Sequence, residues 1–317
     1  MSLDELMSSQ AGVVSRRQVL ASGHDDNHIE KQLRKRHWSR VHPGVYVGHT
    51  GRLSWEQRSW AAVLFYGDAA LCGASATAAW GQREPSARET IHVAVDQSRR
   101  VGSLPGVRVH RLTGFAAHVH PTRRPPIVRL ELAVLQCASK ARTERSAVAA
   151  LSDACQSRRT TAGRLAERLR SMSRLPRRAF LLELLEDVAT GTFSVLEHRY
   201  LTKVERPHGL PTAQRQRRVA PGRRPAYRDV EYLGGALVVE LDGRLGHDET
   251  EDRWADLDRD IDSVEAGATT VRLAWGQVLD PCRAASAVGR LLRAVGWRGT
   301  VKPCGPACSG MPRRAAA

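Results

Sequence analysis

Two carboxylates lie on either side of a glycine pair in the C-terminal third of the sequence. Asp229 and Glu240 each belong to a short strand-like stretch, and Gly234-Gly235 between them predicts a hairpin that brings them together. Because side chains alternate along a strand, Asp242 lies on the same face as Glu240. Carboxylates and a backbone carbonyl, here that of Leu241, are ligands of hard divalent cations. The pattern predicts a Mg²⁺ or Mn²⁺ site, where the cation would polarise a phosphate oxygen and activate water for phosphodiester cleavage.

These carboxylates also have structural explanations. Asp229 can terminate a strand, and Asp242 followed by Gly243 is an ordinary turn signal. Two acids at the end of the apolar stretch that contains Glu240 cost desolvation unless a cation or an arginine compensates their charge. The residues therefore leave two explanations for this site, a bound metal or arginine partners.

The distribution of charge favours a polyanionic ligand. The formal net charge is +16, yet residues 229–265 contain 13 of the 33 acidic residues and only three arginines. A basic protein with one acidic region suits a nucleic acid that is bound broadly and cut locally. GC-rich coding explains the preference for Arg over Lys, but not the excess of positive charge. The arginine-rich stretch 164–178 is a linker, a phosphate-contacting face or a solvated surface.

Residues 1–50 contain the signals of two helices followed by a hairpin. Ser15 predicts the start of one helix, which ends at Gly23, and a second helix follows over 27–36. The turn at 42–44 predicts two short strands on either side of it. This order is typical of a winged helix-turn-helix domain, and its basic residues are the expected DNA contacts: Lys31, Arg34, Lys35, Arg36 and Arg40.

Periodicity places the remaining elements. Helices are expected over 54–80 and 130–186, with strands over 90–95 and 107–111 between them. The last domain is expected to contain a helix capped by Ser194, the carboxylate hairpin, a helix over 249–266, a strand over 269–274 and a final helix to 297, in the order α, β, β, α, β, α. We expect an α+β multidomain protein with these parts: a winged helix at 1–50, a middle α/β domain with a helical linker at 51–190, a nuclease-like α/β core at 191–298 and a disordered tail at 299–317.

Composition excludes several classes of protein. The chain has 317 residues and 42% hydrophobic residues, without an apolar run that could span a membrane or a signal peptide. The six cysteines show no disulfide framework, which is typical of a reducing compartment, and a cytoplasmic location is expected. Cys304 and Cys308 would need two further ligands to hold zinc.

Two family resemblances support this organisation. The segments 19–23 and 38–46, and then 73–137 with the small-residue stretch 73–81, resemble AbiEi-type antitoxins of type IV toxin–antitoxin systems. That resemblance implies a winged helix, a DNA operator as a partner and a cognate toxin encoded nearby.

Residues 193–297 are similar to domains related to the very-short-patch-repair endonuclease, a branch of the PD-(D/E)xK superfamily with the restriction-endonuclease-like fold. The matching pieces are 194–197, 209–211, 228–229, 239–243, His247 and 256–260. The resemblance implies that Glu197 of the first helix joins the metal site, unless it pairs with Arg228. The superfamily's lysine is replaced by Asp242. Endonucleases of the very-short-patch-repair type also lack it and use histidine, which implies His247 as the general acid or base, unless it is a surface loop residue.

The sequence thus predicts a DNA-binding protein with a Mg²⁺-dependent endodeoxyribonuclease domain. The alternative is a non-catalytic, antitoxin-like transcriptional repressor.

Overall fold

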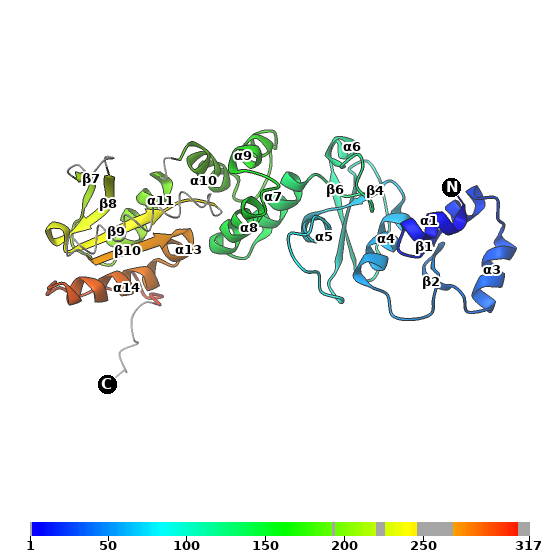
Figure 1. Cartoon of the computed structure of the whole chain (residues 1–317), viewed down its shortest axis with the longest axis horizontal. Coiled ribbons are helices and arrows are strands. Elements are labelled where there is room, and N and C mark those ends of the chain that lie inside the picture. The colour runs from blue at the N-terminus through cyan, green and yellow to red at the C-terminus, as the bar shows by residue number, and fades with distance from the viewer. Residues whose placement is uncertain (1, 192–193, 220–225, 246–268, 310–317) are drawn as a thin grey trace. The chain divides into compact units, whose positions relative to one another are not determined.

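The computed structural model describes residues 2–191, 194–219, 226–245 and 269–309. Contacts within the chain define two compact units, residues 1–137 and residues 138–317. The division falls inside the range 51–190 that the sequence assigns to one middle domain. Helices and three small sheets among the described residues make this an α+β protein, as predicted (Figure 1). Every described helix is too short or too polar to cross a lipid bilayer.

The first elements of the N-terminal unit form three helices around a small antiparallel sheet of order β1-β3-β2. Their bounds are α1 (Leu3–Ser9), β1 (Val13–Ser15), α2 (Arg16–Ala21), α3 (Asp26–Arg34), β2 (Ser39–His42) and β3 (Val45–Val47). Ser15 caps α2 in a capping box with Gln18, and Asp25 caps α3. The two predicted helices and the predicted hairpin are present. The strand β1, which completes the sheet, was not predicted.

The small sheet has a hydrophobic core on each face. Val14, Ile29, Trp38 and Tyr46 belong to the core that includes α2 and α3. Val13, Val45 and Val47 belong to a second core with Trp60 of α4 (Trp55–Tyr66). The predicted boundary at residue 50 therefore lies within a continuous hydrophobic structure, because α4 covers the second face of the sheet.

The rest of this unit surrounds a second sheet of order β4-β5-β6. The elements are β4 (Ala69–Leu71), α5 (Gly73–Ala79), β5 (Ile91–Asp96), β6 (Val107–Leu112) and α6 (Phe115–His118). The strand β4 pairs antiparallel with β5, whereas β5 and β6 are parallel. The sequence predicted β5 and β6. The segment of β4 was predicted to be a turn within a helical region, because periodicity cannot distinguish a strand from a turn in a run of only three apolar residues.

Four helices follow along the chain: α7 (Leu130–Lys140), α8 (Glu144–Gln156), α9 (Ala162–Arg170) and α10 (Arg178–Thr190). The arginine-rich stretch 164–178 covers most of α9 and the connection to α10. Leu165, Ala166 and Leu169 of α9 are buried, so α9 is a packed helix with a basic exposed face rather than a linker. An ion pair between Arg170 and Glu186 joins α9 to α10.

The C-terminal elements form a four-stranded sheet of order β10-β9-β8-β7. They are α11 (Ser194–Arg199), the π-helical η1 (Tyr200–Glu205), β7 (Gln214–Val219), β8 (Ala226–Tyr232), η2 (Leu233–Gly235), β9 (Leu237–Asp242), β10 (Thr269–Ala274), α13 (Trp275–Val278) and α14 (Pro281–Ala294). The strands β7, β8 and β9 are antiparallel neighbours, and β9 is parallel to β10. The predicted carboxylate hairpin is β8-η2-β9, with Gly234 at φ +66° in the turn. The helix predicted over 249–266 lies outside the described residues.

The end of the described chain differs from the expectation of a disordered tail beginning at residue 299. Val301 is buried against Gly289 of α14, and the backbone N–H of Lys302 donates to the carbonyl of His208 at 2.8 Å. Val301 and Lys302 thus hold the start of the described segment 299–309 against the C-terminal unit.

Candidate functional site

The β8–β9 hairpin brings Asp229 next to the end of β9. Val230 faces Val239 and Glu231 faces Val238 in the antiparallel register. One carboxylate oxygen of Asp229, Oδ2, accepts the backbone N–H of Leu241 at 2.8 Å. Asp229 is half-buried, and the bond fixes its carboxylate beside the strand that carries Glu240.

Glu240 and Asp242 lie on one face of β9, as strand alternation requires, while Leu241 between them is buried on the other face. The end of β9 is held by Trp275, whose indole Nε1 donates to the carbonyl of Gly243 at 3.0 Å. The hairpin therefore places three carboxylates along one side of two paired strands, on a backbone anchored at its end.

Both carboxylates of β9 have arginine partners. Glu240 lies opposite Arg272 in the parallel register with β10, and Nη2 of Arg272 donates to Oε2 of Glu240 at 3.0 Å. Asp242 accepts a bidentate pair from Nε and Nη2 of Arg244, both at 3.0 Å, and also the backbone N–H of Arg244 at 3.0 Å. These ion pairs compensate the charge of two acids on an apolar strand, which is the alternative to a bound metal that the sequence left open.

The environment of Asp242 keeps it ionised. Burial acts to raise the pKa of Asp242, but the hydrogen bonds and positive charge of Arg244, together with the charge of Arg272, lower this pKa below its ordinary value of 3.8. At neutral pH the site therefore carries an anionic Asp242 whose charge is compensated by guanidinium groups.

A buried polar network lies behind the hairpin, on the opposite face of the sheet. The hydroxyl of Tyr232 donates to Oε2 of Glu205 at 3.0 Å and lies 2.9 Å from the hydroxyl of Tyr200. Arg215 of β7 also donates to this Glu205 oxygen, at 2.6 Å. Burial raises the pKa of both tyrosine hydroxyls, so they remain neutral hydrogen-bonding groups. This network, which the sequence did not predict, connects η1 to β7 and β8 and so helps to position the hairpin.

Glu197 and His247 were also predicted for this site. Glu197 is half-buried on α11, and among the described residues neither Glu197 nor Asp242 joins Asp229 and Glu240 in a group of three side chains that could hold a metal ion. His247 lies outside the described residues.

The cap predicted for α11 was Ser194, and the structure corrects it. Asp187 accepts the backbone N–H groups of Ser194 and Val195, both at 3.0 Å.

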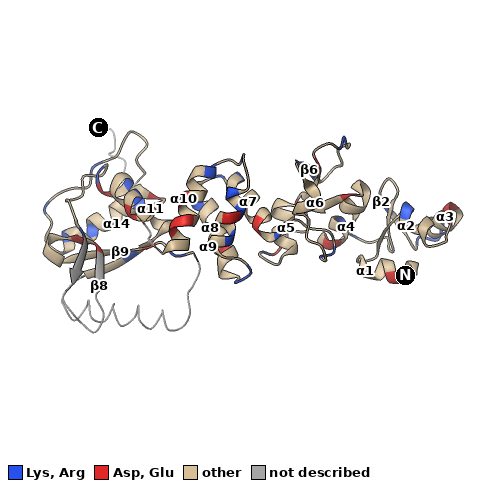
Figure 2. Ribbon diagram, turned by 90° about the horizontal axis from the view of Figure 1, so that it is seen from above, with Lys and Arg blue, Asp and Glu red and all other residues tan. Residues whose placement is uncertain are grey.

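The predicted DNA-contacting residues lie at the other end of the chain, on and after α3. The helix turns Ile29 and Leu33 into the core and leaves its opposite side exposed. The exposed basic side chains of this region, on α3, the turn after it and β2, form what we call the α3 basic face: Lys31, Arg34, Lys35, Arg36 and Arg40. Within the described part of the chain, none of them has an ion-pair partner. Lys and Arg are blue in Figure 2.

The α3 basic face is held by local structure. Arg36 has φ +56° and ends the helix, so the chain turns directly into β2. A bidentate ion pair between Arg16 and Asp26 joins the start of α2 to the start of α3. The ring of Trp38 stacks on Tyr46 at 6.0 Å between centroids, which ties the turn after α3 to β3. The basic side chains therefore project from a packed scaffold.

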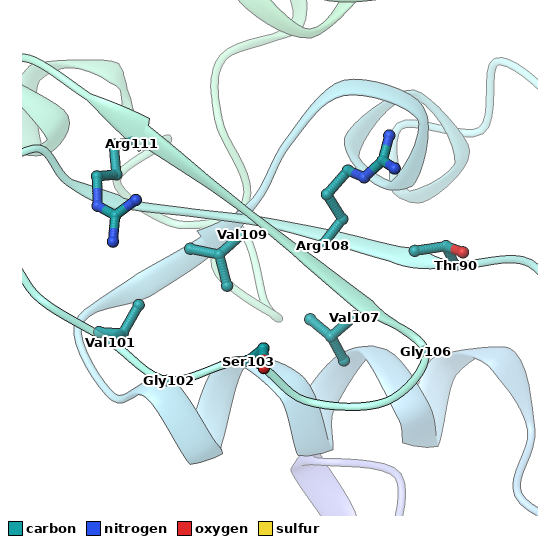
Figure 3. A pocket seen from close by; sticks show the side chains of 9 residues that line it. All are labelled: Thr90, Val101, Gly102, Ser103, Gly106, Val107, Arg108, Val109 and Arg111. Carbon is teal, nitrogen blue, oxygen red and sulfur yellow. The ribbon is translucent and has the colours of Figure 1, made fainter.

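A shallow hollow of about 500 Å³ lies beside β6 in the N-terminal unit. Figure 3 shows Val101, Val107 and Val109 around it, with Arg111 at one end and Arg108 directed to the other side of the strand. Its lining residues, all within the described chain, include no carboxylate, thiol or imidazole. The hollow thus offers no side chain for metal binding or for acid–base chemistry near neutral pH.

Comparisons with known proteins do not identify this chain. No protein-family model matches it. No curated protein matches it either. Among solved structures, it is similar to the crystal structure of RV2827C protein from Mycobacterium tuberculosis, with a TM-score of 0.35, 20% sequence identity and coverage of 57% of this chain and 74% of that chain. A similarity of this degree does not support an inference about function.

Proposed function

We propose that this protein binds duplex DNA through the α3 basic face. The observation that carries the proposal is that five exposed basic side chains on α3, the following turn and β2 have no ion-pair partner among the described residues. Cations that the protein leaves uncompensated on its surface are suited to phosphate oxygens, which contribute much of the binding energy for DNA.

The arrangement of the surrounding elements supports the same proposal. The helix α3 follows α2 after a short turn, and the hairpin β2-β3 follows α3. In winged helix-turn-helix domains the second helix of this motif enters the major groove, and the hairpin contacts the adjacent backbone. Assigning these roles to α3 and to β2-β3 puts Lys31 and Arg34 at the groove, and Arg40 at the backbone.

Binding of fluorescent duplex DNA to the full chain tests this function. The double variant Arg34→Ala/Lys35→Ala should weaken binding at least tenfold, because each lost phosphate contact removes a favourable electrostatic term. The matched control is Arg88→Ala/Arg100→Ala, which removes two exposed arginines elsewhere in the same unit. Equal affinity of both double variants and the wild-type chain would reject the proposal.

We propose metal-dependent cleavage of DNA as a second function, which the alignment of Asp229, Glu240 and Asp242 along the hairpin favours. Asp229, Glu240 and the carbonyl of Leu241 would hold Mg²⁺ or Mn²⁺, and the bound ion would supply polarisation of the phosphate and activation of water. In this proposal Glu197 reaches the site through water, and Asp242 and His247 form its rim.

The donor set fits a hard cation, but Arg272 and Arg244 already compensate two of the carboxylates. Cation binding therefore has to compete with these ion pairs. Cleavage of supercoiled plasmid by the full chain with Mg²⁺ or Mn²⁺ is the test, with Asp229→Asn as the inactive variant and Asp280→Asn as the control. If Asp229→Asn cleaves as fast as the wild-type chain, the hairpin is not the site of cleavage.

Binding without cleavage would instead support a regulator of the antitoxin type. In that case the α3 basic face should protect a discrete site in the promoter of its own gene, and Glu240→Ala should leave this protection intact. A neighbouring gene for a cognate toxin would favour the same conclusion. Equal affinity for random duplex and for the upstream region would argue against it.

A further inference from the structure

Three thiols and one imidazole converge at the edge of the C-terminal unit, away from the carboxylate hairpin in sequence. The ligand atoms of His208, Cys282, Cys304 and Cys308 all lie within 4.8 Å of one another. The Sγ atoms of Cys282 and Cys304 are 3.5 Å apart, and Sγ of Cys308 lies 3.9 Å from Nε2 of His208. We propose that these four residues form a structural zinc site.

The spacing of the ligand atoms fits a tetrahedral ion. With Zn–S bonds of about 2.3 Å and Zn–N bonds of about 2.0 Å, tetrahedral geometry places neighbouring ligand atoms roughly 3.5–3.8 Å apart. The distance of 3.5 Å between the sulfurs of Cys282 and Cys304 agrees with this, whereas a disulfide requires about 2.05 Å. Three thiolates and an imidazole form a donor set that selects zinc over the hard cations expected at the hairpin.

The imidazole of His208 is oriented as a metal ligand should be. Its Nδ1 lies 2.9 Å from the carbonyl oxygen of Val204, which can only accept a hydrogen bond. Nδ1 therefore carries the proton, and the lone pair of Nε2 is directed toward Cys308. The side chain is buried, with an exposed fraction of 1%, so its orientation is fixed. A hydrogen bond from the second ring nitrogen to a backbone carbonyl is the usual support of a zinc-bound histidine.

The segment that carries two of the ligands has little else to hold it. From Lys302 to Ser309, no residue is fully buried, and the polypeptide includes prolines at 303 and 306. Within this described segment, the backbone N–H of Lys302 donates to the carbonyl of His208 at 2.8 Å, and that of Cys308 donates to the carbonyl of Gly305 at 3.1 Å. A metal ion bound to Cys304 and Cys308 explains why an exposed, polar segment returns to α14 and to the end of η1.

Four protein ligands complete a tetrahedral shell, so this site has no position for water or substrate. It is structural rather than catalytic. The ion would join the end of η1, which leads to His208, to the start of α14 at Cys282 and to the segment that carries Cys304 and Cys308. Since η1 also carries Glu205 and Tyr200 of the network behind the hairpin, zinc would stabilise the unit that contains the carboxylates.

Metal analysis of the full chain, purified under reducing conditions without added metal, tests this proposal. We expect about one zinc per chain, and a Co²⁺-substituted protein with the intense absorption of tetrahedral thiolate coordination. Cys304→Ser and Cys308→Ser should each lower the zinc content severalfold. Cys155→Ala, which changes a cysteine of α8 in the same unit, should retain it.

Two outcomes would overturn the site. One is a wild-type chain with negligible zinc that also fails to bind added Zn²⁺ or Co²⁺, a result that does not depend on how the variants fold. The other is a zinc content that is the same in Cys304→Ser, Cys308→Ser and the wild-type chain. Neither outcome bears on DNA binding or on Mg²⁺-dependent cleavage, which are measured separately.

Discussion

Arg272 of β10 and Glu240 of β9 face each other in the parallel register, and Nη2 of Arg272 donates to Oε2 of Glu240 at 3.0 Å. The glutamate expected to bind a metal is thus compensated by a charge from the neighbouring strand. Their side chains are 31% and 22% exposed, which makes the pair partly screened by water. A cation bound by Glu240 would have to displace this pair.

Removing Arg272 should strengthen metal binding. In Arg272→Ala, Glu240 loses a positive neighbour that competes with the cation, so the affinity for Mn²⁺ should rise roughly three- to tenfold, which corresponds to about 1 kcal/mol. Calorimetric titration of the full chain measures it. Arg293→Ala, at an exposed position of α14, is the control. An unchanged Mn²⁺ affinity in Arg272→Ala would mean that Glu240 is not a ligand.

The pH dependence of stability should report the ion pair of Asp242 with Arg244. Because the pKa of Asp242 in the folded protein is lowered below 3.8, its contribution is fully present above pH 3.8 and is lost as pH falls through the folded pKa. Asp242→Asn should therefore destabilise the chain by about 1 kcal/mol at pH 7, and this difference should shrink in acid below pH 3.8. Thermal unfolding of both proteins as a function of pH gives the comparison. A difference that grows on acidification would contradict the assignment.

Arg215 should matter more for stability than its partly exposed position suggests. Glu205 is buried, with 4% of its side chain exposed, and Arg215→Met would leave this carboxylate without its cation. The expected loss is about 3 kcal/mol, whereas Tyr232→Phe, which removes the hydrogen bonds of this hydroxyl with Glu205 and Tyr200, should cost about 1–2 kcal/mol. Urea unfolding of the full chain measures both. The interpretation fails if Arg215→Met is as stable as the wild-type chain while Glu205 remains buried.

Salt should reveal how many phosphates the α3 basic face contacts. If Lys31, Arg34, Lys35, Arg36 and Arg40 each neutralise one phosphate, the logarithm of affinity should fall against the logarithm of salt concentration with a slope of about −4 to −5. Arg34→Ala/Lys35→Ala should make this slope shallower by about 2. Anisotropy titrations between low and moderate salt provide the slopes. A wild-type slope that the double variant leaves unchanged would place the DNA elsewhere.

Local features of this protein were evident in the amino-acid sequence. Capping by Ser15, the turn before β3 and the hairpin between Asp229 and Glu240 depend on residues within a few positions of one another. Strand alternation alone placed Glu240 and Asp242 on one face. The α+β class and the basic side chains of α3 followed from the same short-range patterns, because caps, turns and periodicity act over a single element.

The tertiary structure decided the partners of these residues. Arg272 reaches Glu240 only because β10 pairs in parallel with β9, and Arg215 of β7 reaches Glu205 because the chain turns back after η1. From the sequence, Cys304 and Cys308 lacked the two further ligands that zinc requires. Those ligands lie far away along the chain, since Cys282 is 22 positions from Cys304 and His208 is 100 positions from Cys308. Such contacts arise from the packing of elements that are distant along the chain. Their residue types were visible in the sequence, but their proximity depends on strand order and chain reversal, which no local pattern encodes.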